Sequence, residues 1–363
     1  MDNTENYTHD CINLAILCHG EWQETAHINF VSLGLVVLDE LRLPSGAILC
    51  DNIGGSGAYG TLGARIVTEP TRAHEVGCFI LAGQDFPPHV AALLKNWNIS
   101  LEVNVDNDKL STRGLLEYHD ETFNYKTFRY LTPPLQPMPR HLPRFLLASE
   151  SFHILLAPEN VSPCMNDLLQ LRQQHKVGQR PLIVWEPLPA KCLKEHLEMH
   201  MQACGSVDIF SPNHLELLSL FDEATEAFNR ELIEESAARL LKPQPLSAVK
   251  AIVVRAAEHG CFLMDGVNKK WLPPFYSHND RVIDVTGAGN TFLGALTTVF
   301  QRTRDLTESA IQATVAASFA LEQISLPERT VTQESGEVWN GVKVSQRLEE
   351  YRARLCHPEN DFV

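Results

Sequence analysis

The chain has 363 residues, 44% of them hydrophobic and 21% charged, which is an ordinary composition for one large α/β domain or two smaller ones. Its 45 acidic and 30 basic residues give a formal net charge of −15, which argues against a nucleic-acid partner and against an anionic-membrane surface. Nine scattered cysteines without CxxC spacing indicate neither a disulfide framework nor a zinc site. We therefore predict a cytoplasmic protein, with a nuclear location as the alternative.

The first third of the chain mixes buried and half-exposed patterns. Residues 1–27 are polar and are predicted to be an N-terminal extension. An apolar strand and a half-polar strand follow, and then a glycine turn leads into a helix of small residues over 54–67. Alternating polar and apolar residues over 101–106 and 114–120 are typical of a sheet with one exposed face. We assign these strands, within about 38–52 and 100–130, to a small β lid over a substrate cleft.

A proline-rich connector over 131–143 divides this part from the rest, because it can form neither a helix nor a central strand. Strands and helices then alternate as far as residue 296, which predicts a mostly parallel sheet with helices on both faces. Ligands of such sheets bind beyond the carboxyl ends of the strands. We place one domain at 28–345 and a C-terminal tail at 346–363.

The segment "IDVTGAGNTF" (283–292) has the pattern of a strand end, a glycine turn and a helix start. Gly287 and Gly289 can adopt backbone angles closed to other residues, and N–H groups at a helix start favour negative charge. The turn is therefore a candidate anion cradle. A tight strand–helix connection without a ligand is the alternative.

Residues 284–292 resemble the signature D-[TV]-[TV]-G-A-G-D-x-F of the ribokinase-like (PfkB) carbohydrate kinases, except that Asn290 stands in place of the last Asp. Further stretches match in the family's order over roughly 28–330: "SLGLVVLDEL", "GGSGAYGTLGARI", "AGQDF", "SPNHLEL" and "VVRAAEHG". The second of these is most similar to a fungal branch of the family, the "maintenance of killer" type.

The resemblance implies a ribokinase-like α/β fold, with ATP and Mg²⁺ as cofactors and a small-molecule hydroxyl acceptor such as a sugar or nucleoside. It implies a monomer, or a homodimer formed through the lid. Implied substrate-binding residues are Asp39, Gly54, Gly55 and Tyr59, and implied nucleotide-binding residues are Asn213, Arg255, Ala257, Gly260, Asp284 and Thr286. Glu216 is the implied metal residue, while Gly287, Ala288, Gly289 and position 290 are the implied catalytic residues. A capping box is the alternative reading of Asn213 and Glu216, which are three residues apart.

Three departures bear on activity. Tyr59 replaces the family's Asn and would fill space meant for substrate hydroxyls, and Arg255 and Ala257 replace the Thr and first Gly of the nucleotide turn. Arg255 would either bind a phosphate or plug the site. Asn290 is no base, and losing a general base typically costs ~10²–10⁴ in rate.

Two hypotheses follow from these departures. The first is an impaired small-molecule kinase, in which Asn290→Asp should raise phosphoryl transfer. The second is a pseudokinase that acts as a ligand-binding or scaffolding protein. A dinucleotide-binding oxidoreductase is disfavoured, because no G-x-G-x-x-G directly follows the first strand with an acidic residue ~20 further on.

Overall fold

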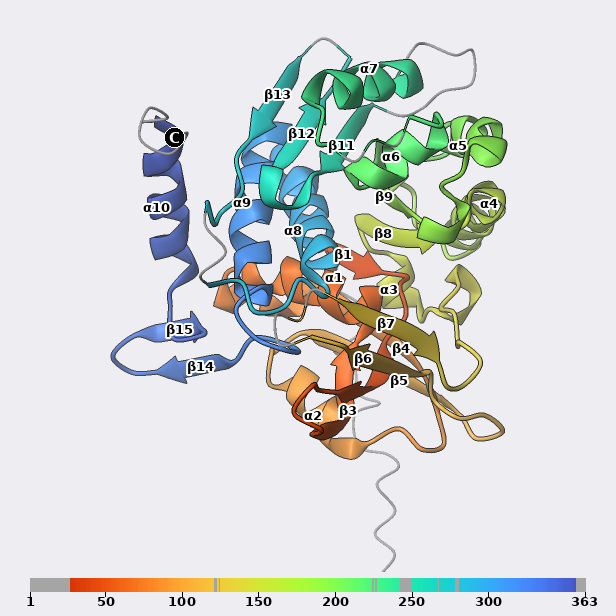
Figure 1. The fold of residues 1–363 in the computed structure, drawn as a ribbon. Helices are drawn as coiled ribbons and strands as arrows, with labels where there is room; N and C mark the ends of the chain where they lie inside the picture. Colours follow the sequence, from red (N-terminus) through yellow and green to blue (C-terminus); the bar gives the residue numbers. More distant parts are fainter. Residues whose placement is uncertain are drawn as a thin grey trace, which may run out of the picture.

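A nine-stranded sheet forms the centre of the computed structural model, in the order β13-β12-β11-β10-β9-β8-β1-β4-β5 (Figure 1). The structure describes residues 27–356 except 121, 122, 124, 224, 226, 242–249, 267 and 278–280. The expected N-terminal extension therefore lies outside the described residues, apart from His27.

In the order of the sheet, all strands from β5 at one edge to β11 run parallel. Strands β12 and β13 add an antiparallel hairpin at the other edge. The strands are β1 (Phe30–Ser32), β4 (Val76–Gly83), β5 (Ser100–Asp106), β8 (Ser151–Leu156), β9 (Leu182–Pro187), β10 (Ile209–Phe210), β11 (Ala251–Arg255), β12 (Cys261–Met264) and β13 (Lys269–Leu272). The mostly parallel sheet expected from the strand–helix alternation is therefore present.

Successive side chains of each strand point to opposite faces of the sheet. Both faces therefore present apolar side chains, and helices cover both of them. In β9, Leu182 and Val184 belong to one hydrophobic cluster and Ile183 and Trp185 to the other. The first cluster packs under α1 (Gly55–Ile66), α2 (Pro88–Lys95), α8 (Ala288–Thr303), α9 (Leu306–Ala320) and α10 (Val344–Cys356). The second packs under α3 (Arg144–Leu147), α4 (Pro158–Gln174), α5 (Leu197–Cys204), α6 (His214–Leu220) and α7 (Arg230–Leu241).

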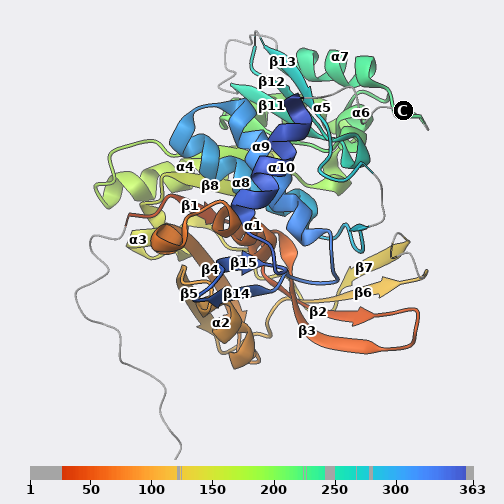
Figure 2. The ribbon, with the colours of Figure 1, turned by 90° about the vertical axis from the view of Figure 1, so that its left-hand side faces the viewer.

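A separate four-stranded sheet, the lid, stands away from the main sheet with the strand order β3-β2-β6-β7 (Figure 2). Its strands are β2 (Val37–Arg42), β3 (Ile48–Gly54), β6 (Arg113–Tyr118) and β7 (Lys126–Tyr130). The expectation that residues 101–106 belong to the lid is wrong, because β5 pairs in parallel with β4 of the main sheet. An edge strand leaves one face partly exposed, which gives the same alternation as a lid strand.

The C-terminal segment belongs to the domain, and the expected tail over 346–363 is wrong as far as residue 356. Helix α10 covers residues 344–356, its Tyr351 is fully buried, and the Tyr351 hydroxyl donates to the Pro273 carbonyl at 2.5 Å. A hairpin of β14 (Arg329–Thr332) and β15 (Gly336–Trp339) precedes it. No helix in the described ranges has the length and apolar character needed to cross a membrane.

Candidate functional site

The turn before α8 lies too close to the side chains of Tyr59 and Arg255 for a residue larger than glycine at 287 or 289. Gly287 is the N-cap residue of α8 with φ +78°, and a Cβ added there would collide with the Tyr59 ring. Contrary to expectation, no strand precedes the turn in residues 282–285. The amides of Ile283 and Asp284 instead donate to the Leu321 carbonyl, just after α9. The carboxyl end of α9 therefore anchors the candidate anion cradle.

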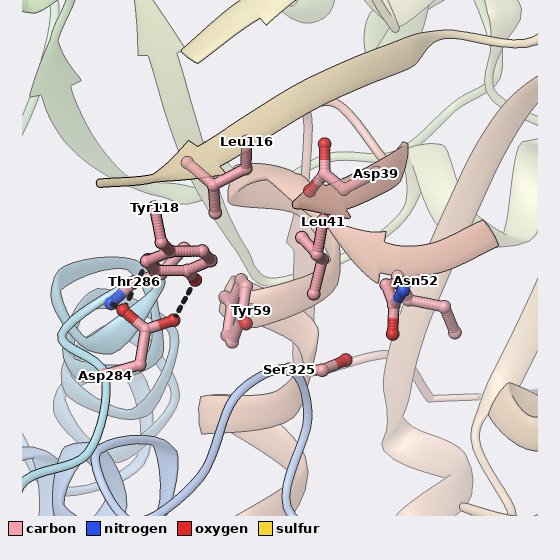
Figure 3. Close-up of a pocket in the computed structure, with 10 residues that line it drawn as sticks. Asp39, Leu41, Asn52, Tyr59, Leu116, Tyr118, Asp284, Thr286 and Ser325 are labelled. Atoms are coloured by element: carbon pink, nitrogen blue, oxygen red, sulfur yellow. Dashed lines mark hydrogen bonds between the residues drawn. The ribbon is translucent and has the colours of Figure 1, made fainter. Parts of the chain in front are cut away.

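The lid is fastened to this turn by two side chains. Lys126 of β7 donates to Asp284 Oδ1 at 2.6 Å and to Thr286 Oγ1 at 2.5 Å. The Tyr118 hydroxyl of β6 donates to Asp284 Oδ2 at 2.6 Å (Figure 3). Asp284 is buried. Burial and the bond to Asp284 raise the pKa of Tyr118, which therefore stays protonated and donates. Asp284 and Thr286, implied as nucleotide-binding residues, are engaged by the lid.

Arg255 lies at the centre of a buried charge cluster. Its guanidinium lies 2.9 Å from the Glu186 carboxylate and 3.5 Å from that of Glu216. A Cβ added to Gly289 would lie 2.5 Å from Arg255 Nη1, so Arg255 also reaches the start of α8. The Asn290 amide donates to Glu186 Oε2. These contacts bring Arg255, Glu216, Gly289 and Asn290 together.

The two carboxylates differ in their electrostatic setting. Burial would raise the pKa of Glu186, but the charge of Arg255 and hydrogen bonds from His153 and Arg255 lower it, so Glu186 is ionised. Burial dominates at Glu216 and raises its pKa, with Arg255 opposing. One guanidinium therefore neutralises much of the charge of this pair.

The capping box, kept as the alternative for Asn213 and Glu216, is present. Asn213 Oδ1 accepts from the Glu216 amide at 2.8 Å, and Glu216 Oε2 accepts from the Asn213 amide at 2.7 Å. Glu216 therefore caps α6 and contacts Arg255 with the same oxygen. Across the described residues, no group of three or more His, Cys, Asp or Glu side chains could hold a metal ion.

These residues do not fit the Mg²⁺ ion that the resemblance implied at Glu216. A guanidinium already lies where a cation would meet Glu216 and Glu186, and its charge repels a divalent ion at that position. Mg²⁺ also takes carboxylate and water oxygens, whereas Arg255 offers donors alone.

The turn after β11, where the resemblance implied nucleotide binding, is closed by a hydrogen bond within its own backbone. Ala257 has φ +49°, and Gly260 has φ +85°. The Ala256 amide donates to the Gly260 carbonyl at 2.8 Å, and the His259 ring stacks on Phe228 with centroids 3.6 Å apart. The structure thus places Ala257 and Gly260 in a closed turn that directly follows Arg255.

Asp39 lies on β2 of the lid. Its carboxylate sits between two glycines of the flanking strands, because a Cβ at Gly54 or Gly114 would collide with it. The residue is 7% exposed, and its Oδ1 has no hydrogen-bond partner in the described part of the chain. Burial raises the pKa of Asp39 to about 7.

A cavity of about 390 Å³ lies between the lid and the α8 turn, within the usual range of small-ligand pockets. Asp39, Gly55, Tyr59, Gly287 and Asn290 line it, which joins the implied substrate and catalytic residues in one space. Tyr59 is almost completely buried and also borders a narrower recess beside Tyr118 and Asp284 (Figure 3). The Tyr59 ring therefore fills part of the cleft, as its length indicated.

Sequence reasoning missed Glu186, Lys126, Phe128 and Tyr130. Glu186 follows an apolar run in "PLIVWEP", and a carboxylate ending a buried strand is a signal that could have been used. Glu186 also accepts from His153, whose ring bonds Ser32 at 3.1 Å. The lid residues carry no such signal, because their role depends on how the lid folds over α8.

Solved structures share this architecture at low sequence identity. They include ribokinase from Giardia lamblia (TM-score 0.66, 14% identity, 91% of this chain and 100% of that one) and phosphofructokinase-2 from Escherichia coli (TM-score 0.62, 15% identity, 91% and 100%). A nucleoside kinase from Methanocaldococcus jannaschii also matches (TM-score 0.57, 19% identity, 90% and 99%). The fold is therefore the ribokinase-like α/β fold, with a lid sheet over a cleft.

Sequence comparison then gives the family. Residues 73–329 match the pfkB family carbohydrate kinases. The chain is 32% identical to Schizosaccharomyces pombe protein C16C9.01c, over 93% of this chain and 96% of that protein. It is 25% identical to Protein MAK32 of Saccharomyces cerevisiae, over 88% and 91%. The chain belongs to the pfkB carbohydrate kinase family, and these two relatives support the fungal branch that the glycine signature indicated.

Proposed function

We propose that this protein binds a hydroxylated small molecule beneath its lid and does not transfer a phosphoryl group from Mg-ATP, which makes it a pseudokinase. The observation that carries the proposal is the position of Arg255, between Glu186 and Glu216 and against Gly289.

Two requirements of phosphoryl transfer are unmet in this cluster. Metal ions normally bridge the transferred phosphate and neutralise its charge, but Arg255 holds the cation position and is itself neutralised by carboxylates. A base is normally needed at position 290, but Asn290 cannot accept the acceptor's proton and its amide is committed to Glu186. Both losses act on the same step.

The cavity beneath the lid supports the proposal that the protein binds a hydroxylated small molecule. It retains the buried carboxyl group of Asp39, whose Oδ1 has no partner among the described residues, and such a group is costly unless a ligand supplies a donor. Gly54 and Gly114 have no side chains, and this leaves the space that the Asp39 carboxyl group occupies. A ligand hydroxyl would supply the hydrogen bond that the protein does not.

Calorimetric titration with Mg-ATP, and with ATP in excess EDTA, tests the proposal. We expect no binding in either buffer for the wild type. The variant Arg255→Thr should gain binding in Mg²⁺ only, while Arg352→Ala, an exposed arginine paired with Glu308, serves as control. Wild-type turnover of Mg-ATP with any hydroxylated acceptor would overturn the pseudokinase assignment.

A slow kinase is the second candidate, and the 287–289 turn favours it. Gly287 keeps the left-handed conformation that opens the turn at the start of α8, which is the geometry of an anion cradle. This candidate requires Arg255 to leave its carboxylate partners when the nucleotide arrives. Mg-ATP binding by the wild type that Arg255→Thr strengthens would favour it.

We propose a monomer or a homodimer formed through the lid, in the cytoplasm or the nucleus. The outer lid strand β3 exposes Ile48 and Leu49, which is where a second lid would pack. Sedimentation velocity of the wild type and of Ile48→Glu distinguishes the two states, because the charged variant should be monomeric in either case.

A further inference from the structure

The loop between α9 and β14, residues 321–328, lies between the lid and the C-terminal unit, by which we mean β14, β15 and α10. On the lid side, Ile324 packs against an apolar cluster that includes Tyr118. Ser325 lines the narrow recess beside Tyr118 and Asp284 (Figure 3). The φ angle of Ser325 is +72°, in the left-handed region, which is unfavourable for serine. Contacts around the loop must therefore hold this conformation.

Helix α10 holds the loop through a buried ion pair. Arg347 of α10 is 4% exposed, and its Nη2 donates to both carboxylate oxygens of Glu322, at 2.7 and 2.6 Å. The Tyr276 hydroxyl and the Asn340 amide donate to the same carboxylate, at 2.5 and 2.9 Å. Burial would raise the pKa of Glu322, but these hydrogen bonds lower it, so the carboxylate is ionised. Because a buried charge is stable only when it is paired, Glu322 stays where Arg347 places it.

The residue next to Glu322 carries this position to the candidate site. The Leu321 carbonyl accepts from the Ile283 amide at 2.7 Å and from the Asp284 amide at 3.3 Å. The Asp284 carboxylate in turn accepts from Lys126 of the lid. An uninterrupted series of contacts therefore runs from α10 through the loop and the α8 turn to the lid.

We propose that α10 controls the lid. With the ion pair between Arg347 and Glu322 in place, residues 321–325 hold the α8 turn where the lid bonds to it, and release of α10 lets the lid open. Helix α10 stands next to α9 at the outside of the molecule and forms no part of any sheet, so it can detach while every strand stays paired (Figure 1). The inference goes beyond the proposed function, because it concerns how the lid is held and not what binds beneath it.

Hydrogen exchange of the whole chain tests the inference, because exchange reports local opening element by element. In Arg347→Met, amide exchange in β6 and β7 should rise about 5- to 150-fold, the range of typical coupling between two sites, while β8 and β9 exchange at wild-type rates. Arg172→Met is the matched control, because it removes another buried arginine, which donates to the Leu147 and Ser149 carbonyls under the opposite face of the sheet. It should leave exchange in β6 and β7 unchanged.

A milder variant keeps the test open if Arg347→Met does not fold. Glu322→Gln retains the shape of the side chain, removes its charge and should raise exchange in β6 and β7 in the same direction. Wild-type exchange of the lid in these variants would overturn the inference. An equal rise in the lid and in β8 and β9 would overturn it as well, because that result reports a loss of stability of the whole domain.

Coupling between two sites is reciprocal, which supplies a second test from the other end. Lys126→Met frees the lid from Asp284 and should therefore raise amide exchange in α10. Lys194→Met, which removes an exposed lysine paired with Asp222, is the control and should leave α10 unchanged. Wild-type exchange of α10 in Lys126→Met would show that the lid and α10 move independently, and would overturn the inference.

Discussion

The Arg255 guanidinium lies 2.9 Å from the carboxylate of Glu186, and both side chains are largely buried. Each residue lies at the carboxyl end of a strand of the parallel sheet, β11 for Arg255 and β9 for Glu186, so the sheet itself brings them together. A buried charge is retained only when it is paired, and here the pair occupies the place where the fold is expected to meet the phosphates and metal of a nucleotide. The chemistry of the site is thus set by an internal ion pair.

Removing the guanidinium should create a divalent cation site. In Arg255→Ala, Glu186 and Glu216 lose their shared cation, and breaking a buried pair typically costs about 3–5 kcal/mol. We expect the variant to melt at a lower temperature than the wild type. Mn²⁺ should then raise the melting temperature of the variant and leave the wild type unchanged.

The exposed variant Arg352→Ala is the control for this experiment and should respond to Mn²⁺ as the wild type does. Paramagnetic resonance of Mn²⁺ gives an independent reading of binding. Equal Mn²⁺ binding by wild type and Arg255→Ala would show that Arg255 does not exclude the metal.

Lys126 and Tyr118 bond to Asp284 and so form a latch between the lid and the α8 turn. Of the two residues, Lys126 should contribute more to the free energy of unfolding. Lys126→Met leaves the Asp284 carboxylate buried with one cation fewer, and we expect a loss of about 3–5 kcal/mol in the free energy of unfolding. Tyr118→Phe removes one hydrogen bond to that carboxylate and should cost about 1.5–3 kcal/mol. Urea denaturation measures both values, and hydrogen exchange should show faster opening of β6 and β7 in each variant.

The exposed pair of Lys194 and Asp222 supplies the control, because Lys194→Met should cost at most about 1 kcal/mol. If Lys126→Met is as mild as this control, the lid is not held by the latch.

The sequence predicted the main sheet because inner strands such as β4, β8 and β9 are buried apolar runs separated by helical periods. It misassigned β5 because alternation reports the exposure of one face, and an edge strand of the main sheet has the same exposure as a lid strand. It also predicted a strand before Asp284, where the backbone instead bonds to Leu321.

At the candidate site, the sequence identified the residues that belong to a motif, but it did not identify the residues that bond to them. Asn290 was evident as a departure, but its bond to Glu186 depends on α8 lying over the end of β9. Whether Arg255 binds a phosphate or plugs the site was likewise open, because the answer depends on two carboxylates from other elements, Glu186 of β9 and Glu216 of α6.

Gly287 and Tyr59 should be coupled. Gly287→Ala places a Cβ into the Tyr59 ring and imposes a left-handed conformation on alanine, at a backbone cost of about 1–3 kcal/mol. Tyr59→Ala should remove the steric part of the penalty and keep the backbone part. We therefore expect the double variant to be more stable than the sum of the single losses, as measured by urea denaturation in a double-mutant cycle. Strict additivity would show that the ring moves aside freely.

Asp39 should make stability depend on pH. Its native pKa of about 7 lies above the unfolded value near 3.8, so the native protein holds a proton that the unfolded chain has lost over this interval. The free energy of unfolding should therefore fall as pH rises from about 4 to 7. Asp39→Asn removes this dependence and should gain up to about 4 kcal/mol relative to the wild type by pH 8.

Urea denaturation across the pH range checks this gain, with the exposed Asp108→Asn as control. The comparison uses the difference between the variant and wild-type curves, because other groups titrate equally in both. A difference that stays constant from pH 4 to 8 would show that Asp39 is ionised in the native state.

From the sequence alone, Asn290→Asp is expected to restore a base and raise phosphoryl transfer by up to ~10²–10⁴. The structure adds a condition, because the Asn290 amide donates to Glu186 and a carboxylate at 290 would face another carboxylate. Two such groups cannot both ionise easily, so the native pair should retain a proton that the unfolded chain loses. Asn290→Asp should therefore be close to wild-type stability near pH 5 and lose about 1–3 kcal/mol by pH 8, whereas Asn290→Ala should show no such slope.

The phosphoryl-transfer activity of the position 290 variants should also depend on the neighbouring charges. Asn290→Asp alone should give no turnover of Mg-ATP, since Arg255 still holds the cation position. The double variant Asn290→Asp with Arg255→Thr frees Glu186 and Glu216 for a metal and supplies the base, so any gain in phosphoryl transfer should appear there first. Transfer of labelled γ-phosphate to a panel of nucleosides and sugars measures it. Turnover by Asn290→Asp with Arg255 in place would show that the base alone was missing, and that the ion pair yields when Mg-ATP binds.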